Sequence, residues 1–88
     1  MDYLLFIYPN CDKCDAFKNY LKGTSLVGQE LSLVQKESKL RLREFLGWIK
    51  RDDKGAIIIP VFVLREDGKV LGVFNDHPEL DSWLRSRA

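Results

Sequence analysis

The chain of 88 residues contains little cysteine, histidine or proline: two, one and three residues. Two cysteines are too few for the disulfide scaffold that holds many small secreted domains together. There are 14 Lys and Arg residues against 13 Asp and Glu, so no excess of one charge favours nucleic-acid binding. No apolar run approaches the roughly 20 residues that span a membrane. We therefore expect neither a nucleic-acid nor a membrane partner.

The composition that remains is typical of a globular protein. Hydrophobic residues make up 45% of the chain and charged residues 31%, which is unlike a disordered sequence. The length predicts one domain over residues 1–88. The opening residues have an acid at Asp2 and only a short apolar run, which does not match a secretory signal. We expect a monomer in a reducing, cytoplasmic compartment.

Apolar runs and helical stripes alternate along the chain. Strands are expected over residues 3–8, 30–35, 61–65 and 69–74, and helices over about 11 residues ending at Gly23, over residues 38–51, and from Pro78 onwards. Asp67-Gly68 is a strong hairpin signal, and the third strand should begin after Pro60 because proline cannot donate to a central ladder. The order β-α-β-α-β-β-α predicts an α/β fold with a four-stranded mixed sheet and helices on both faces.

Both cysteines belong to one motif, Cys11-Asp12-Lys13-Cys14, at the junction of the first strand and the first helix. The start of a helix presents unpaired N–H groups and the positive end of its dipole, which stabilise a thiolate. Cysteines in such positions have pKa values of about 3.5–7.5, compared with about 8.5 for a free thiol. Cys11 should be reachable by solvent, and Cys14 should be shielded because it lies on the apolar stripe. This predicts Cys11 as nucleophile and Cys14 as resolving thiol in disulfide exchange.

The charged neighbours of the cysteines do not decide whether the Cys11 thiolate is favoured, and three alternatives to disulfide exchange stay open. Lys13 should favour the Cys11 thiolate, whereas Asp12 and Asp15 should oppose it, and the net sign does not follow from the sequence. The cysteines could instead be free thiols without a role. They could belong to a metal or iron–sulfur module, which would need a second chain or an added thiol because the lone His77 is distant in sequence. A redox-inert interaction domain is the third alternative.

The order of these features resembles a glutaredoxin of the thioredoxin-like superfamily over nearly the whole chain. It has a strand, a Cys-x-x-Cys motif that opens a helix, an Ile59-Pro60 pair before a strand hairpin, and a closing helix. The resemblance implies a thiol–disulfide oxidoreductase that acts on glutathione mixed disulfides or protein disulfides. It also implies that Pro60 is cis and lies against the cysteines.

The backbone beside Pro60 is a candidate substrate contact. A proline at a strand start leaves neighbouring backbone groups without ladder partners. The N–H and C=O groups of Ile59 could then pair with an extended substrate beside Cys11, as the family does. The alternative is a proline that only sets the geometry of the strand start.

Three departures from the family concern glutathione. The chain has Asp12-Lys13 where glutaredoxins usually have Pro-Tyr, Tyr8 where they often have a lysine that holds a glutathione carboxylate, and Gly72-Val73 where they have Gly-Gly. Asn75 and Asp76 precede the last helix, whose free N–H groups are candidates for the γ-glutamyl carboxylate. Asp76 is equally well explained as a helix cap.

Glutathione is therefore a candidate reductant, and we expect neither a tightly bound cofactor nor a metal. Recycling of the dithiol would need glutathione or a reductase. A local basic cluster lies in the second expected helix, at Lys36, Lys39, Arg41 and Arg43. Such a cluster is typical of a solvated helix face and could steer an anionic thiol such as glutathione.

Overall fold

The computed structural model describes residues 1–87, and its four strands form a single sheet. The strands are β1 (Asp2–Ile7), β2 (Val27–Ser32), β3 (Val61–Glu66) and β4 (Lys69–Phe74), in the order β2-β1-β3-β4. β1 is parallel to β2 and antiparallel to β3, and β3 is antiparallel to β4. The predicted α/β class and four-stranded mixed sheet are confirmed.

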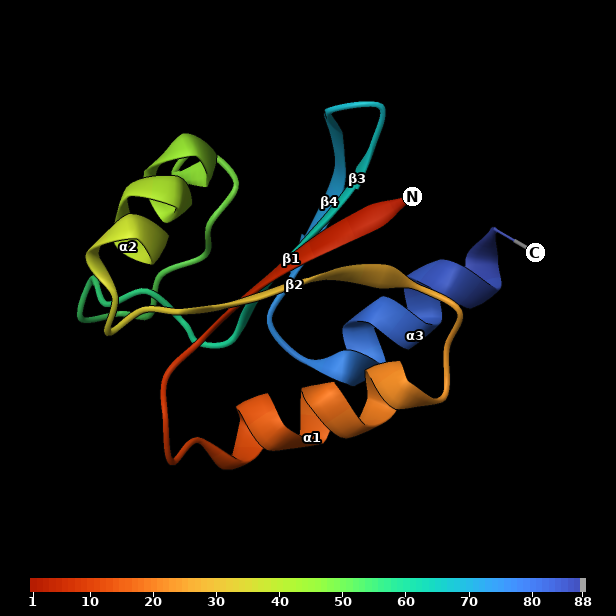
Figure 1. Cartoon of the computed structure of the whole chain (residues 1–88), viewed down its shortest axis with the longest axis horizontal. Helices are drawn as coiled ribbons and strands as arrows, with labels where there is room; N and C mark the ends of the chain where they lie inside the picture. The colour runs from red at the N-terminus through yellow and green to blue at the C-terminus, as the bar shows by residue number, and fades with distance from the viewer. Residues whose placement is uncertain (88) are drawn as a thin grey trace.

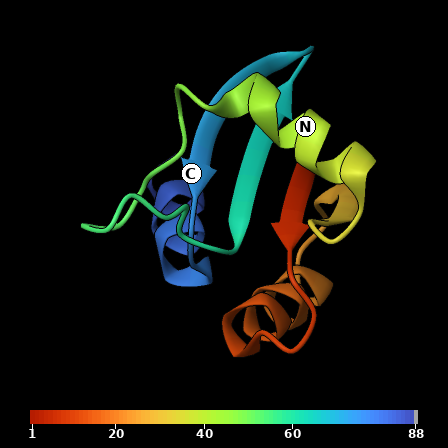
Figure 2. The same cartoon turned by 90° about the vertical axis from the view of Figure 1, so that its left-hand side faces the viewer.

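The helices cover both faces of this sheet, as predicted. They are α1 (Asp12–Lys22), α2 (Lys36–Leu42), continued by a short 3-10 turn η1 (Arg43–Phe45), and α3 (His77–Ser86). Figure 1 shows α1 and α3 on one side of the strands and α2 on the other, and Figure 2 shows α2 running across them. Within the described part of the chain, no helix combines the length and the apolar character that a membrane crossing requires.

Two apolar layers, one on each face, make up the core. The layer under α1 and α3 includes Leu5, Cys14, Phe17, Phe62 and Leu80. The layer under α2 and η1 includes Leu4, Phe6, Leu42, Phe45 and Val63. Consecutive residues of β1 and β3 alternate between the two layers because side chains of a strand point to opposite faces. Both central strands are therefore buried on both sides, which explains their unbroken apolar runs.

The second strand lies three residues earlier than predicted. The apolar residues Leu31, Leu33 and Val34 favoured a strand over residues 30–35, but the strand is Val27–Ser32. β2 pairs only with β1, and its first four residues are exposed. An edge strand of this kind carries no continuous apolar run, so the sequence pattern favoured the buried Leu33, which follows the strand.

The second helix is shorter than predicted. The stripe Leu42, Phe45, Leu46 and Ile49 indicated a helix over residues 38–51, but α2 ends at Leu42, η1 ends at Phe45, and a turn follows. Gly47 lies in this turn, and glycine costs about 1 kcal/mol in a helix interior relative to alanine. Leu46 is 45% exposed as a result, while Ile49 packs on the core from outside the helix.

The turn after β3 and the proline before it lie where the sequence predicted them. Asp67 and Gly68 both have positive φ, 51° and 78°, which is the backbone conformation that a two-residue hairpin of the I′ type requires. β3 begins directly after Pro60, and the Ile59–Pro60 peptide bond is cis, as the resemblance implied.

Candidate active site

Cys11 is the N-cap residue of α1. Pro9 and Asn10 turn the chain out of β1, and Asn10 has a φ of 57°, a conformation that asparagine tolerates better than most residues. The Cys14 N–H donates to the Cys11 Sγ at 3.2 Å, and the Asp15 N–H donates to the Cys11 carbonyl at 3.0 Å. The sulfur therefore occupies the place that a serine or aspartate oxygen takes in an ordinary cap.

Cys11 and Cys14 are joined by a disulfide, with their Cα atoms 5.2 Å apart. Their exposure differs as predicted. Cys14 is 1% exposed and belongs to the core layer that contains Phe17 and Phe62. Cys11 is half-buried and packs against the edge of the same layer. Cys11 is therefore the more accessible of the two cysteines.

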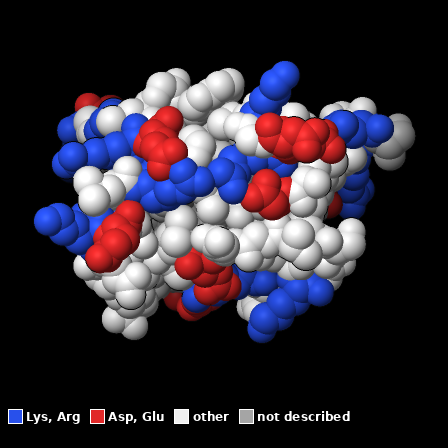
Figure 3. All heavy atoms as spheres, turned by 45° about the horizontal axis from the view of Figure 1, so that its top comes forward, with Lys and Arg blue, Asp and Glu red and all other residues white. Residues whose placement is uncertain are grey.

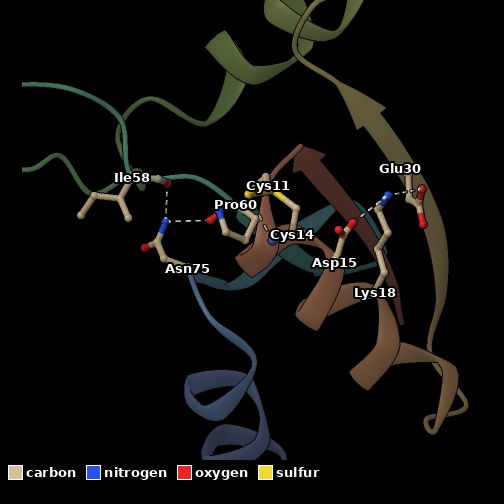
Figure 4. The surroundings of a disulfide bond; sticks show 8 residues. All are labelled: Cys11, Cys14, Asp15, Lys18, Glu30, Ile58, Pro60 and Asn75. Atoms are coloured by element: carbon tan, nitrogen blue, oxygen red, sulfur yellow. Dashed lines mark hydrogen bonds and ion pairs between the residues drawn. A yellow bond between two sulfur atoms is a disulfide. The ribbon is translucent and has the colours of Figure 1, made fainter. Parts of the chain in front are cut away.

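The segment before β3 is among the surroundings of the disulfide (Figure 4). The Asn75 Nδ2 group donates to the carbonyls of Ile58 at 2.8 Å and Pro60 at 3.1 Å. Both partners are acceptors, so the orientation of the amide is settled by its hydrogen bonds. Asn75 thus fastens the carbonyl groups of the two residues on either side of Ile59.

The backbone of Ile59 itself makes no hydrogen bond that we find within residues 1–87. Its neighbours differ in this respect: the Ile58 N–H donates to the Lys50 carbonyl at 3.2 Å. Ile59 is only half-buried and packs against both core layers. Its N–H and C=O groups have no hydrogen-bond partner among the described residues.

Charged residues around the cysteines are exposed. Asp12 and Lys13 lie in the first turn of α1 and both face solvent. The Lys18 Nζ lies 3.9 Å from carboxylate oxygens of both Asp15 and Glu30 (Figure 4). Exposed pairs of this kind contribute little to stability, but Lys18 offsets part of the negative charge that Asp15 brings to the first turn.

Asp76 acts as the N-cap of α3. Its Oδ1 accepts a hydrogen bond from the Glu79 N–H at 2.9 Å, and the Glu79 Oε1 accepts one from the Asn75 N–H at 3.3 Å. Asp76 therefore has the role of a helix cap, which is one of the two interpretations that the sequence allows. Asn75 is 6% exposed and directs its amide to the Ile58–Pro60 backbone, an internal role that no local sequence signal indicates because its partners lie 15 and 17 residues away.

Tyr8 is 42% exposed. Together with Ile59 it lines a cavity of about 560 Å³ between α2 and the segment that leads to Pro60. The structure thus brings Cys11, Cys14, Pro60 and Asn75 into one region, with Tyr8 and Ile59 on the side toward α2. Lys13 and Asp76 lie at the starts of the two helices that share the opposite face.

Metal-ligating groups do not gather in the part of the chain that is described. Among residues 1–87, no three His, Cys, Asp or Glu side chains come together as a metal site requires.

No protein-family model matches the chain, and no match was found among curated proteins or solved structures. Function therefore has to follow from the chemistry of Cys11, Cys14 and their neighbours.

Proposed function

We propose that the protein is a glutaredoxin-like thiol–disulfide oxidoreductase of thioredoxin-like topology. Cys11 is the nucleophile, Cys14 is the resolving thiol, and the substrates are protein disulfides or glutathione mixed disulfides. Glutathione or a reductase returns the dithiol to its reduced form. The chemistry needs no tightly bound cofactor.

The observation that carries this proposal is the position of the Cys11 sulfur. It accepts the N–H of Cys14 at the first turn of α1 and belongs to a half-buried residue, while Cys14 is fully buried. A hydrogen bond from a backbone N–H strengthens when its acceptor becomes an anion. The same contact therefore favours the thiolate over the thiol, and the thiolate is the reacting species.

The surrounding fold supports the same role. A cysteine without a function in exchange does not require a solvent-reachable helix cap, a partner sulfur in bonding range and a neighbouring backbone with unused hydrogen-bonding groups. Here Cys11, Cys14 and Ile59 provide these three features together. The central strand β1, buried on both faces, leads directly to them.

The reaction follows from these positions. The Cys11 thiolate attacks one sulfur of a substrate disulfide; the substrate S–S bond breaks, a Cys11–substrate disulfide forms, and one substrate thiolate leaves and takes up a proton. Deprotonated Cys14 then attacks the Cys11 sulfur and releases the second substrate thiol. Two electrons pass from the dithiol to the substrate, and the protein ends as the Cys11–Cys14 disulfide.

A comparison of single-cysteine variants tests the proposal. Cys11→Ser should abolish reduction of every disulfide, because the remaining thiol is buried. Cys14→Ser should still react once and accumulate a mixed disulfide with the substrate, visible as an added mass on the intact protein. Alkylation of Cys11 in this variant should be half-complete at a pH clearly below about 8.5.

Free glutathione, alkylated under the same conditions, is the control for the alkylation measurement. Cys11→Ser supplies a second control, because alkylation of its buried Cys14 should be slow in the folded protein and fast in urea. Half-alkylation of Cys11 near pH 8.5, together with equal residual activity in the two variants, would contradict the proposal. Zinc or iron bound in stoichiometric amount to the purified protein would support the metal module instead.

A further inference from the structure

A cavity of about 560 Å³ adjoins the candidate active site on the side of α2. Its floor is apolar and includes Leu42, Ile57 and Ile59, and its rim includes Leu46, which is 45% exposed. An exposed leucine over a concave apolar surface offers a place for an aliphatic side chain of another molecule.

The lining of this cavity carries charge of one sign only. Lys39, Arg43 and Arg51 contribute to it, and none of the lining residues is acidic. Lys39 and Arg43 are four residues apart through the last turn of α2 and the start of η1, a spacing at which like charges destabilise a helix. In the described part of the chain, neither residue forms an ion pair.

The acids nearest in sequence, Glu37, Glu44, Asp52 and Asp53, do not line the cavity. Glu44 pairs with Arg41 across one helical turn, and the Asp52 carboxylate accepts hydrogen bonds from the backbone N–H groups of Lys54 and Ala56. Figure 3 shows basic and acidic side chains interleaved over the face of the molecule that includes α2. An all-basic lining is therefore a property of the cavity and not of the whole face.

This cavity neighbours the candidate site through Ile59 and Tyr8. Ile59 lines it and also packs against the core layer that Cys11 borders. Tyr8, another lining residue, precedes Cys11 by three positions. A peptide that pairs with the Ile59 backbone would therefore extend toward Lys39 and Arg43.

We propose that the cavity selects protein disulfides whose reacting cysteine lies in an acidic segment with an aliphatic neighbour. The aliphatic side chain enters between Leu42, Leu46 and Ile57, and the carboxylates face Lys39 and Arg43. This selection rests on the proposed function, because the chosen segment must present its disulfide to Cys11. The exchange is the one described above, with the reduced protein as the sole electron donor.

Single-turnover reduction of matched peptide disulfides tests this selection. Three symmetric peptide disulfides share leucine on each side of the cysteine and differ in the outer residues, which are aspartate and glutamate, asparagine and glutamine, or lysine. Glutathione disulfide is the fourth substrate. Stoichiometric reduced protein is mixed with each, and product thiol is followed by mass spectrometry. Rates with dithiothreitol, which is uncharged, correct for the intrinsic reactivity of each peptide.

The acidic peptide should react about tenfold faster than the amide peptide at low salt, with the advantage falling as salt rises, because attraction at the cavity raises the encounter rate. The double variant Lys39→Glu with Arg43→Glu should reverse the order of the acidic and lysine peptides. The control, Lys22→Glu with Lys69→Glu, makes the same change in net charge away from the cavity and should keep the wild-type order.

Equal rates for the three peptides, or an acidic preference that survives in the Lys39 and Arg43 variant, would overturn the selection while leaving the oxidoreductase proposal in place. A faster reaction of glutathione disulfide that depends equally on Lys39 and Arg43 would also overturn it, and would assign the cavity to a small anionic disulfide. Failure of every disulfide to react would instead contradict the proposed function. Circular dichroism of each variant confirms that the comparison is made between folded proteins.

Discussion

Asn75 links two parts of the chain that the sequence gives no reason to connect. Its side chain donates to the carbonyls on either side of Ile59, and its backbone N–H donates to Glu79 in the first turn of α3. The segment before β3 is therefore attached to the start of α3 through one residue. Its buried position makes these hydrogen bonds costly to lose, since the freed carbonyls would remain away from water.

Replacement of Asn75 should test this attachment. Asn75→Ala removes both donors and should lower the free energy of unfolding by about 1–3 kcal/mol. Asn75→Asp should lower it further at neutral pH, because a carboxylate cannot donate to the Ile58 and Pro60 carbonyls and would face them with like charge. Urea denaturation measures both. Asn75→Asp as stable as Asn75→Ala would show that the amide does not hold these carbonyls.

Tyr20 joins α1 to α3 by donating to Asp81 Oδ1 at 2.9 Å. Burial is the main cause that raises the pKa of Tyr20 above its ordinary value, and the hydrogen bond to Asp81 and the charge of Asp81 add to it. Above pH 10 the unfolded chain would therefore lose this proton before the folded protein does. The free energy of unfolding should decline as the pH rises beyond 10.

The variant Tyr20→Phe should lose about 0.5–1.5 kcal/mol at pH 7, where the hydrogen bond is present. It should also show a smaller decline above pH 10. Part of the decline should remain, because burial and the charge of Glu30 raise the pKa of Tyr3 as well. Urea denaturation between pH 7 and 11 measures both effects. An unchanged alkaline decline in Tyr20→Phe would contradict this account.

At the scale of elements, the sequence predicts the parts of the fold in which local pattern and burial agree. α1 has the expected length of 11 residues and ends at Gly23, and the Asp67-Gly68 hairpin lies where predicted. The Cys11-x-x-Cys14 motif is at the strand–helix junction with the expected difference in exposure. These features depend on residues close together in sequence.

The elements that were misplaced depend on position in the sheet. β2 lies at an edge, so its exposed half has no apolar signal, and the helical stripe through Leu46 and Ile49 continues past the point where the backbone turns away. The same limit applies to the site. The contacts of Asn75 and the cavity between α2 and Ile59 join segments 15 or more residues apart, and no local spacing predicts them.

Gly28 marks the place where β2 passes close to Tyr3. A Cβ atom at this position would overlap both the Tyr3 carbonyl oxygen and the Tyr3 ring. Gly28→Ala should therefore destabilise the protein by about 1–3 kcal/mol, because either the edge strand or the ring must shift. Gly47→Ala is the matched control, since nothing lies within 4 Å of its added Cβ, and it should change stability by less than about 0.5 kcal/mol. Thermal and urea denaturation of the two variants should separate them; equal stabilities would contradict the close approach.

For the whole molecule, Phe62 is the centre of the layer beneath α1 and α3. Its ring is fully buried, stacks on Phe17 with centroids 4.9 Å apart and on Tyr3 at 5.0 Å, and contacts Phe74 in a tilted arrangement. Side chains from β1, β3, β4 and α1 therefore meet at one residue. The loss of this ring would leave a void among its three aromatic neighbours, Tyr3 of β1, Phe17 of α1 and Phe74 of β4.

Phe62→Ala should cost about 3–5 kcal/mol. A chain of 88 residues has a total stability of about 4–13 kcal/mol, so this variant should lose a large fraction of its stability and melt at a clearly lower temperature. Phe62→Leu, which retains most of the volume, should remain folded and retain exchange activity. Calorimetry measures both. A Phe62→Ala protein with a nearly unchanged melting temperature would show that the layer does not depend on this ring.

The burial of β1 has a consequence for how differently shaped substrates could be accepted. Leu4 through Ile7 are buried, and only residues 8–10 separate this strand from Cys11, so the candidate nucleophile lies close to a part of the molecule with little room to adjust. Residues 50–56, which lead toward Pro60 on the other side of the site, are exposed throughout. Accommodation of a bulkier or narrower partner would then fall on that outer segment, while the chemistry stays in a fixed place.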